Sequence, residues 1–308
     1  MWRSLAVEPP FDFERSLRFV CAAPRAAAHL GLEPYADVWQ GREYRRAVWL
    51  PGGTGPVLLR LRNQGTVDAP RLQWQAAPEP AKEPAREALR RLVAHIVSAS
   101  VRLAEFQAAI GGDAVLRELG RRFAGIKIIR APSLYECLVS TVLEQQLNFS
   151  FAHAVKRRLL AAQGQALEFE GRAYWAYPPP ARLAALRPAD LRPLQISERK
   201  ASYLIGLARA VLAGELDAER LAMLPPEEAR ERLLRLRGIG RWTAAYVALR
   251  GLGHADALPA EDVGLQKSVA QLYGLRQYAT ARGIERRWRH LSPWRGYATY
   301  YCWFTQWA

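Results

Sequence analysis

The hydrophobic pattern of the chain changes near residue 85, and this change divides the sequence into two kinds of predicted structure. Before it, short β-branched or alternating runs are separated by breaks such as PGGTGP (51–56), which is typical of an antiparallel sheet. After it, helical periodicity predominates. We therefore expect an α+β fold with an N-terminal α+β sheet domain (1–112) and an all-α domain (113–308). The predicted strand runs are RSLRFVC (15–21), RRAVWLP (45–51), PVLLRLRN (56–63) and PRLQWQA (70–76).

The helices of the second region carry their own start and stop signals. Ser133 is a predicted N-cap, and Glu136 three residues later completes a capping-box pattern. Ser197 is the predicted cap of a later helix. The first of these helices is long and amphipathic, and we expect it to lead out of the sheet domain. The predicted helices are 86–110, 132–147, 196–214 and 225–236.

The charge balance favours a polyanionic partner. The 308 residues include 44 Lys and Arg against 29 Asp and Glu, a formal charge of +15. The alternative is a solvated basic surface without a specific partner. The three cysteines, Cys21, Cys137 and Cys302, lie far apart without a metal-binding spacing, so we expect buried thiols. No apolar run predicts a membrane span or signal peptide, which favours the cytoplasm.

Two glycines interrupt a helical pattern in LLRLRGIGRWTAAYVALRGLG (233–253). We interpret this segment as helix, hairpin and helix, with Gly238 and Gly240 in the turn. Glycines allow a backbone to approach another group closely, and free amide N–H groups there can bind phosphate oxygens. Such contacts hold a nucleic-acid backbone without reading its sequence. The alternative is an ordinary tight turn between packed helices.

The stretch LRGIGRWTAAYVALRGLGHADALPAEDVGLQKSV (236–269) resembles the hairpin, the Gly/Pro-rich loop and the terminal aspartate of the helix-hairpin-helix-GPD superfamily of DNA glycosylases. Within that superfamily the chain is similar to the alkylbase branch, 3-methyladenine DNA glycosylase II. The resemblance implies a monomeric, monofunctional enzyme that flips alkylated purines, such as 3-methyladenine and 7-methylguanine, out of double-stranded DNA and hydrolyses their N-glycosidic bond. It also covers the segments 9–19, 134–147, 199–211 and 293–307.

Asp262 is the catalytic residue that the resemblance implies. A carboxylate suits this role because cleavage of an N-glycosidic bond builds positive charge on the sugar. Asp262 also precedes a predicted helix, whose dipole stabilises a negative charge. The alternative is a purely structural N-cap. Neighbouring Glu261 points about 100° away on a helix and is expected to face solvent, while His254 is expected on the loop surface.

Trp242 stands where strand-cleaving relatives of the superfamily carry a nucleophilic lysine. The resemblance therefore implies base removal without a Schiff base and without strand cleavage. Lys200 and Lys267 are the nearest other lysines in the motif segments, and neither is placed to attack the sugar. The four-cysteine iron–sulfur loop of other relatives is also missing from the sequence, so we expect no required cofactor.

Four aromatic residues are the base pocket that the resemblance implies: Phe19, Trp242, Tyr246 and Trp303. Trp242 and Tyr246 are four apart and share a helix face. Electron-rich rings attract cationic bases by roughly 0.5–2 kcal/mol. Each aromatic taken alone is more often a core residue, and it is their convergence that favours a pocket.

The resemblance also implies a set of DNA contacts and a cation site. Gln146 aligns with the residue that fills the gap left by the flipped base, with surface exposure as the alternative. A sodium or potassium ion is expected on the backbone carbonyls of Leu234, Leu236 and Ile239. The expected DNA-binding residues are Gly238, Ile239, Gly240, Arg241, Thr243, Gln145 and Gln146.

Two other functions remain open from the sequence. The hairpin can serve a DNA-binding module without an enzymatic role, which would need neither Asp262 nor an aromatic pocket. A protein of this shape can also recognise damage without excision, or prefer oxidised or deaminated bases. Val263, where the family often has an aromatic residue, and Gln146, where some relatives have leucine, leave room for this second function.

Overall fold

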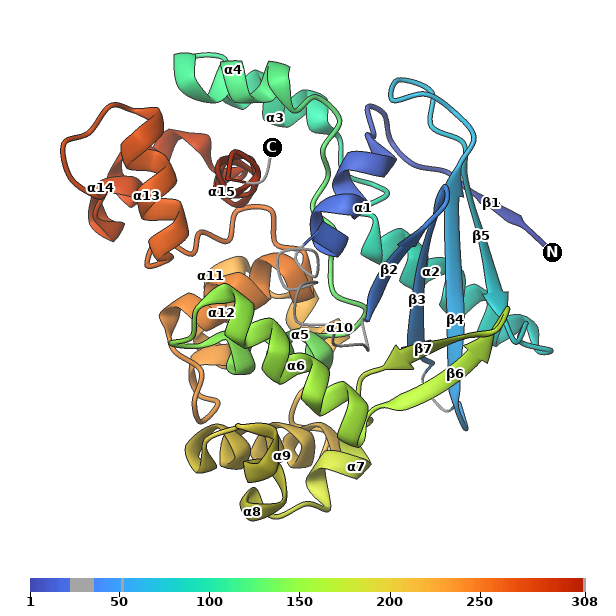
Figure 1. Ribbon diagram of the computed structural model, residues 1–308. Coiled ribbons are helices and arrows are strands. Elements are labelled where there is room, and N and C mark those ends of the chain that lie inside the picture. The colour runs from blue at the N-terminus through green and yellow to red at the C-terminus, as the bar shows by residue number, and fades with distance from the viewer. Residues whose placement is uncertain (23–35, 51–52, 307–308) are drawn as a thin grey trace.

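The computed structural model of the protein describes residues 1–22, 36–50 and 53–306. Its N-terminal part contains a five-stranded antiparallel sheet in the order β1-β5-β4-β3-β2 (Figure 1). Three of the predicted runs overlap strands of this sheet, which confirms an α+β fold. Residues 51 and 52 of the predicted PGGTGP break lie outside the described residues. The strands are β1 (Arg3–Leu5), β2 (Asp37–Gln40), β3 (Glu43–Trp49), β4 (Pro56–Asn63) and β5 (Leu72–Ala77).

The predicted strand at 15–21 is wrong, because these residues belong to helix α1 (Phe13–Ala22). The side chain of Asp12 accepts a hydrogen bond from the Arg15 amide and so caps the start of this helix. Phe13 and Leu17 lie four apart and are buried against the sheet. An i, i+4 apolar pair therefore decided the conformation in favour of a helix.

The two faces of the sheet are covered by different elements. Helices α1 and α2 (Glu83–Ile96) pack on one face, where Leu59 and Leu61 of β4 are fully buried. Leu58 points to the opposite face and packs there with Tyr174, as the two-residue alternation of a strand requires. The sheet is thus buried on both sides.

Tyr174 belongs to a second, two-stranded sheet formed by β6 (Gln165–Phe169) and β7 (Arg172–Ala176). This hairpin corrects the expectation that residues 113–308 are entirely helical. Its turn residues Glu170 and Gly171 have φ angles of 50° and 73°, which suits a two-residue hairpin between twisted strands. The alternating run on either side of the Glu-Gly pair was a usable strand signal.

The long helix predicted at 86–110 is also corrected, because the chain forms α2 and then α3 (Leu103–Ala109) with a break between them. Ser98 in the break has φ 50°, and its hydroxyl donates to the Ile128 carbonyl at 2.6 Å. The buried Lys127 ammonium donates to the Val101 carbonyl at 2.8 Å. Partners distant in sequence thus satisfy polar groups at the break, which periodicity alone does not reveal.

The remaining helices form two hydrophobic cores (Figure 1). One core joins α5, α6, α9, α11 and α12, and the other joins α3, α4, α13, α14 and α15. The expected domain boundary at residue 112 stays a prediction, although α3 shares a core with α4. These helices are α4 (Ala114–Arg122), α5 (Leu134–Glu144), α6 (Phe149–Gln163), α7 (Pro180–Ala184), α8 (Pro188–Leu191), η2 (Arg192–Leu194), α9 (Glu198–Leu212), α10 (Ala218–Met223), α11 (Pro226–Leu234), α12 (Arg241–Val247), η3 (Ala248–Leu252), α13 (Val263–Leu272), α14 (Ala281–Arg287), η4 (Arg289–Leu291) and α15 (Arg295–Phe304).

The predicted caps of two of these helices are confirmed. Ser133 accepts from the Glu136 amide at the start of α5, and Ser197 accepts from the Lys200 amide at the start of α9. The Glu136 carboxylate forms an ion pair with Arg46 of β3. This contact differs from the predicted capping box, in which the Glu136 side chain would return to the start of its own helix. Within the described part of the chain, no helix is long and apolar enough to cross a membrane.

Candidate active site

The turn between α11 and α12 has the predicted hairpin form. Gly238 adopts φ +87°, and a Cβ atom there would lie 2.3 Å from the ring of Tyr203. Both features require glycine. Gly240 is the N-cap of α12 with φ −92°, and a Cβ atom at this position would meet nothing within 4 Å. The surface in front of Gly240 is therefore open.

Gln145 at the C-terminus of α5 forms hydrogen bonds with this turn. Its side-chain amide donates to the Gly238 carbonyl and to the Thr243 hydroxyl, each at 2.9 Å. Thr243 is only 2% exposed. Its hydroxyl is thus an internal contact, and the expected role of Thr243 in DNA binding stays a prediction. Gln145 and Thr243 fix the shape of the turn.

Asp262 is the N-cap of α13, as predicted, and its carboxylate accepts three hydrogen bonds. Oδ1 accepts from the Leu265 amide at 2.7 Å and from the Trp303 indole at 3.0 Å. Oδ2 accepts from the Trp242 indole at 2.8 Å. Donors from α12, α13 and α15 therefore fix both oxygens of one half-buried carboxylate.

The neighbours of Asp262 play no comparable part. Glu261 is half-buried rather than freely exposed, which corrects the expected position in solvent. Val263 is 57% exposed on the outer side of α13. His254 is half-buried, and its ring nitrogen contacts the Ala222 carbonyl at 3.3 Å.

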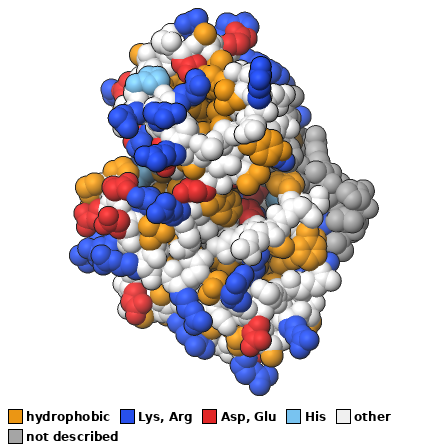
Figure 2. Space-filling view, turned by 90° about the vertical axis from the view of Figure 1, so that its left-hand side faces the viewer, with side chains coloured by type: hydrophobic (Ala, Val, Ile, Leu, Met, Phe, Trp, Pro, Cys, Tyr) orange, Lys and Arg blue, Asp and Glu red, His pale blue; other side chains and the backbone are white. Residues whose placement is uncertain are grey.

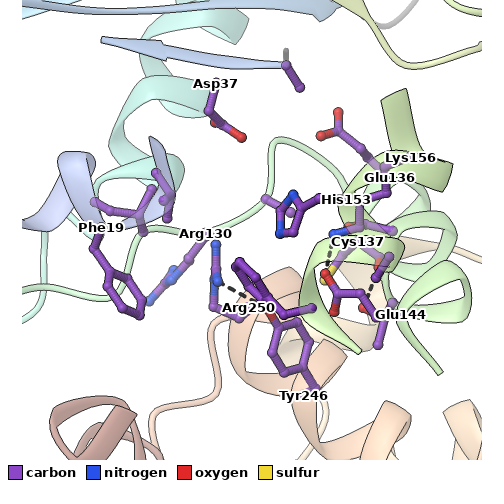
Figure 3. A pocket seen from close by; sticks show the side chains of 18 of the residues that line it. Phe19, Asp37, Arg130, Glu136, Cys137, Glu144, His153, Lys156, Tyr246 and Arg250 are labelled. Atoms are coloured by element: carbon purple, nitrogen blue, oxygen red, sulfur yellow. Dashed lines mark hydrogen bonds and ion pairs between the residues drawn. The ribbon is translucent and has the colours of Figure 1, made fainter. Parts of the chain in front are cut away.

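Asp262 opens onto a cavity of about 480 Å³ that is also lined by the four predicted aromatic residues. The rings of Trp242 and Tyr246 lie 5.6 Å apart, and those of Tyr246 and Trp303 lie 5.7 Å apart. Phe19 stacks on Phe304 at 4.5 Å and reaches the cavity from α1 (Figure 3). Side chains separated by almost 300 residues therefore line one cavity. Its volume is within the range of small-molecule sites.

Charged residues that sequence reasoning missed also line this cavity (Figure 3). Arg46 is paired with Asp37 and Glu136, and Lys156 is paired with Glu144. Burial opposes ionisation of Asp37, but the Arg46 guanidinium holds the pKa of this carboxyl below its usual value.

His153 also lines the cavity. Burial and then nearby Lys156 lower the pKa of His153 to about 4, so its imidazole is neutral at pH 7. Arg46, which directly precedes the apolar run AVW in β3, was a sequence signal of a polar cavity wall.

Gln146 follows α5 and is exposed, with φ +56°. Its side-chain oxygen accepts from Arg199 at 3.3 Å. The Lys200 ammonium donates to the carbonyls of Leu143 and Gln145, at 2.9 and 2.6 Å. Lys267 lies over the ring of Tyr278, 5.5 Å from its centroid. The first lysine is therefore held by the C-terminus of α5 and the second by an exposed ring.

The carbonyls expected to hold a cation lie at the end of α11. Leu234 is the last residue of that helix, and the Leu236 carbonyl accepts from the Ile239 amide at 3.1 Å. A carbonyl oxygen has a second lone pair, so this bond leaves Leu236 able to contact an ion.

The outer surface beside the site carries the expected basic charge. Figure 2 shows Lys and Arg side chains over the face of the helical region that lies at the left of Figure 1, with apolar side chains around a hollow near its middle. Arg241, the first residue of α12, is exposed. A positive rim around an apolar hollow suits a polyanion.

A family model described as HhH-GPD superfamily base excision DNA repair protein matches residues 139–293. The chain belongs to this superfamily, which confirms the predicted family. It is 37% identical over 201 residues to the DNA-3-methyladenine glycosylase of Bacillus subtilis, covering 65% of this chain and 66% of that protein. It is 32% identical over 197 residues to DNA-3-methyladenine glycosylase 2 of Escherichia coli, covering 63% and 65%.

The chain thus spans just under two thirds of the length of each of these two relatives. A solved structure, the 3-methyladenine DNA-glycosylase from Archaeoglobus fulgidus, matches 99% of this chain and 98% of its own with a TM-score of 0.81. At 22% sequence identity, this likeness establishes the fold.

Proposed function

We propose that the protein is a monofunctional DNA glycosylase that hydrolyses the N-glycosidic bond of alkylated purines, of the 3-methyladenine and 7-methylguanine type, in double-stranded DNA. We also propose that it acts as a monomer in the cytoplasm. The observation that carries the proposal is the placement of Asp262. Its carboxylate is fixed by three donors at the edge of an aromatic cavity, next to a hairpin with an open turn.

The reaction needs little more than this geometry. The bond between C1′ of the sugar and the base nitrogen breaks, and the electron pair leaves with the base. Asp262 stabilises the positive charge that builds on the sugar. A water molecule then forms a bond to C1′ and loses a proton to solvent, so that the abasic sugar carries a hydroxyl and the cationic purine is released as a neutral base. The ring walls formed by Trp242, Tyr246 and Trp303 would stack on the extruded base.

The hairpin supports the proposed contact with DNA. The open surface at Gly240 allows the phosphate backbone to approach the amides of Gly238 and Gly240, whereas the Ile239 amide is hydrogen-bonded to the Leu236 carbonyl. Arg241 would add charge at this point, and exposed Gln146 would fill the space left by the flipped base. We also propose that a sodium or potassium ion binds the carbonyls of Leu234, Leu236 and Ile239, where it would add positive charge for the same phosphate.

Incubation with a duplex that contains a single 7-methylguanine tests the proposed function. We expect free 7-methylguanine and an intact abasic strand that breaks only after alkali. Borohydride should trap no covalent adduct, because Trp242 supplies no amine and the Lys200 ammonium is bound to main-chain carbonyls. Binding without base release would instead support a DNA-binding or damage-recognition protein. A trapped band that disappears with Lys200→Gln or Lys267→Gln would contradict the monofunctional reaction.

Trp303→Phe tests whether the indole donors matter for the reaction. The change keeps an aromatic ring but removes the hydrogen bond to Oδ1 of Asp262. A hydrogen bond to a charged group contributes about 1.5–3 kcal/mol, so we expect single-turnover excision to slow by about tenfold. Trp39→Phe is the matched control, since the Trp39 indole has no hydrogen-bond partner and Trp39 does not line the cavity. Equal rates for the two variants would exclude this role.

A further inference from the structure

Two guanidinium groups reach the cavity from segments far apart in the sequence. Arg130 comes from that loop and Arg250 from η3, and Figure 3 shows both between the rings of Phe19 and Tyr246. Arg250 donates from Nη1 to the Tyr246 hydroxyl at 3.2 Å. Arg130 donates from Nη2 to the Gly253 carbonyl at 3.3 Å. Both contacts are with neutral groups.

Neither guanidinium has its full set of partners. The Nε–H groups of Arg130 and Arg250 are both buried without a hydrogen-bond partner. Among the residues that the structure describes, no carboxylate lies within ion-pair distance of either side chain. Two other cations of the cavity, Arg46 and Lys156, do have carboxylate partners. Buried donors without partners are rare in folded proteins, and they are expected where a ligand completes the set.

The sign of this charge matters for the reaction. A purine methylated at N7 is a cation, and it leaves the sugar as a neutral molecule. A neutral purine lesion takes the electron pair of the broken bond and leaves as an anion until it gains the proton released by water. An unpaired guanidinium in the cavity therefore opposes the binding of the cation and stabilises the departing anion.

The hydrogen-bond acceptors of a neutral purine also fit an arginine guanidinium. The N7 and O6 atoms of a purine with a 6-carbonyl accept two hydrogen bonds from one arginine. Methylation at N7 removes one of these acceptors. Arg250 is the better placed of the two arginines, because its Cζ lies 5.8 Å from the centroid of the Tyr246 ring, against which the base would stack.

We propose that Arg250 is a specificity-determining residue. This proposal rests on the proposed glycosylase function. Its guanidinium donates to the acceptor edge of a flipped neutral purine and stabilises the negative charge of that base as it leaves. It contributes nothing favourable to the release of a cationic purine. The aromatic rings and Arg250 thus favour opposite classes of base within one cavity.

The test compares single-turnover excision of hypoxanthine, which is neutral, and 7-methylguanine, which is cationic, in duplexes of one sequence. With Arg250→Gln we expect hypoxanthine release to fall by about tenfold or more, as for the loss of a charged donor. Release of 7-methylguanine should change by less than about twofold or become faster. Arg250→Lys, which keeps the charge, should recover part of the hypoxanthine activity.

Arg287→Gln is the matched control, since this arginine also lies over a tyrosine ring, Tyr273, but does not line the cavity. It should leave the ratio of the two rates unchanged. An equal loss for both bases with Arg250→Gln would mean a structural role and would overturn the proposal. If the glutamine variant does not fold, Arg250→Lys decides the question. A loss of hypoxanthine release alone supports the role of the guanidinium donors. Equal losses for both bases, or no loss for either base, overturn the proposal.

The outcome for the wild-type protein separates the two proposals. Release of 7-methylguanine without any release of hypoxanthine would overturn the role of Arg250 and leave the proposed function standing. Release of neither base would contradict the proposed function itself, and the role of Arg250 with it.

Discussion

Asp262→Asn is expected to slow base excision by two or more orders of magnitude while DNA binding is kept. The change removes the negative charge that would stabilise the sugar cation, and the loss of one such group typically costs a factor of 10²–10³. Asparagine remains a good N-cap for α13, because its side-chain oxygen can accept from the Leu265 amide. The fold should therefore survive. Single-turnover release of 7-methylguanine and a separate measurement of DNA affinity check this result.

Glu261→Gln is the matched control for this variant. It removes a carboxylate at the neighbouring position, but Glu261 does not line the cavity. We expect its excision rate to stay within about twofold of the wild type, since nothing places its charge near the sugar. Near-wild-type release by Asp262→Asn, or an equal loss in both variants, would contradict the assignment of Asp262.

The parts of the site that the sequence predicted are those carried by short, local patterns. The hairpin and Asp262 lie within one segment of 34 residues, 236–269, and the resemblance to a known family covers that segment in full. Ser133 and Ser197 were predicted as caps because a cap depends on only a few consecutive residues. The aromatic residues followed from the same family resemblance. Their direct hydrogen bonds to Asp262 were not predicted, because these depend on the relative positions of α12, α13 and α15.

The charged wall of the cavity could not be predicted for a similar reason. Arg46, Arg130 and Arg250 come from a strand, a loop and a short helical segment that are far apart in the sequence. Only the packing of the sheet against α5 brings Arg46 to Glu136. Arginine is also the commonest cation of this chain, so a buried guanidinium has no pattern that distinguishes it from a solvated one.

The errors in the fold have different causes. Residues 15–21 have strand-like composition, but Asp12 caps a helix there and two residues spaced by one helical turn bury against the sheet. The β6-β7 hairpin was missed because its strands are short and lie between longer helical segments. Packing against β3 stabilises it, and the Tyr174 hydroxyl accepts from Arg45 at 2.8 Å. Tertiary contacts thus decided both segments.

Gly238→Ala and Gly240→Ala are expected to differ strongly, although the two glycines are only two residues apart. At Gly238 the methyl group would collide with the Tyr203 ring in a left-handed backbone conformation. Strain and overpacking together should lower the free energy of unfolding by about 2–4 kcal/mol. At Gly240 the backbone is of ordinary type and the space in front of it is open. The expected stability change there is within about 1 kcal/mol, as measured by thermal or denaturant unfolding.

A larger side chain at Gly240 tests whether DNA binds at this open surface. Gly240→Leu should also fold, but its side chain would occupy the surface that we assign to the phosphate backbone. We expect weaker binding to damaged and undamaged duplexes alike, since backbone contacts carry no sequence information. The wild-type affinity should fall steeply with salt, because each neutralised phosphate releases counterions. A leucine variant with unchanged affinity would place the DNA elsewhere, and a loss confined to one duplex sequence would contradict a backbone contact.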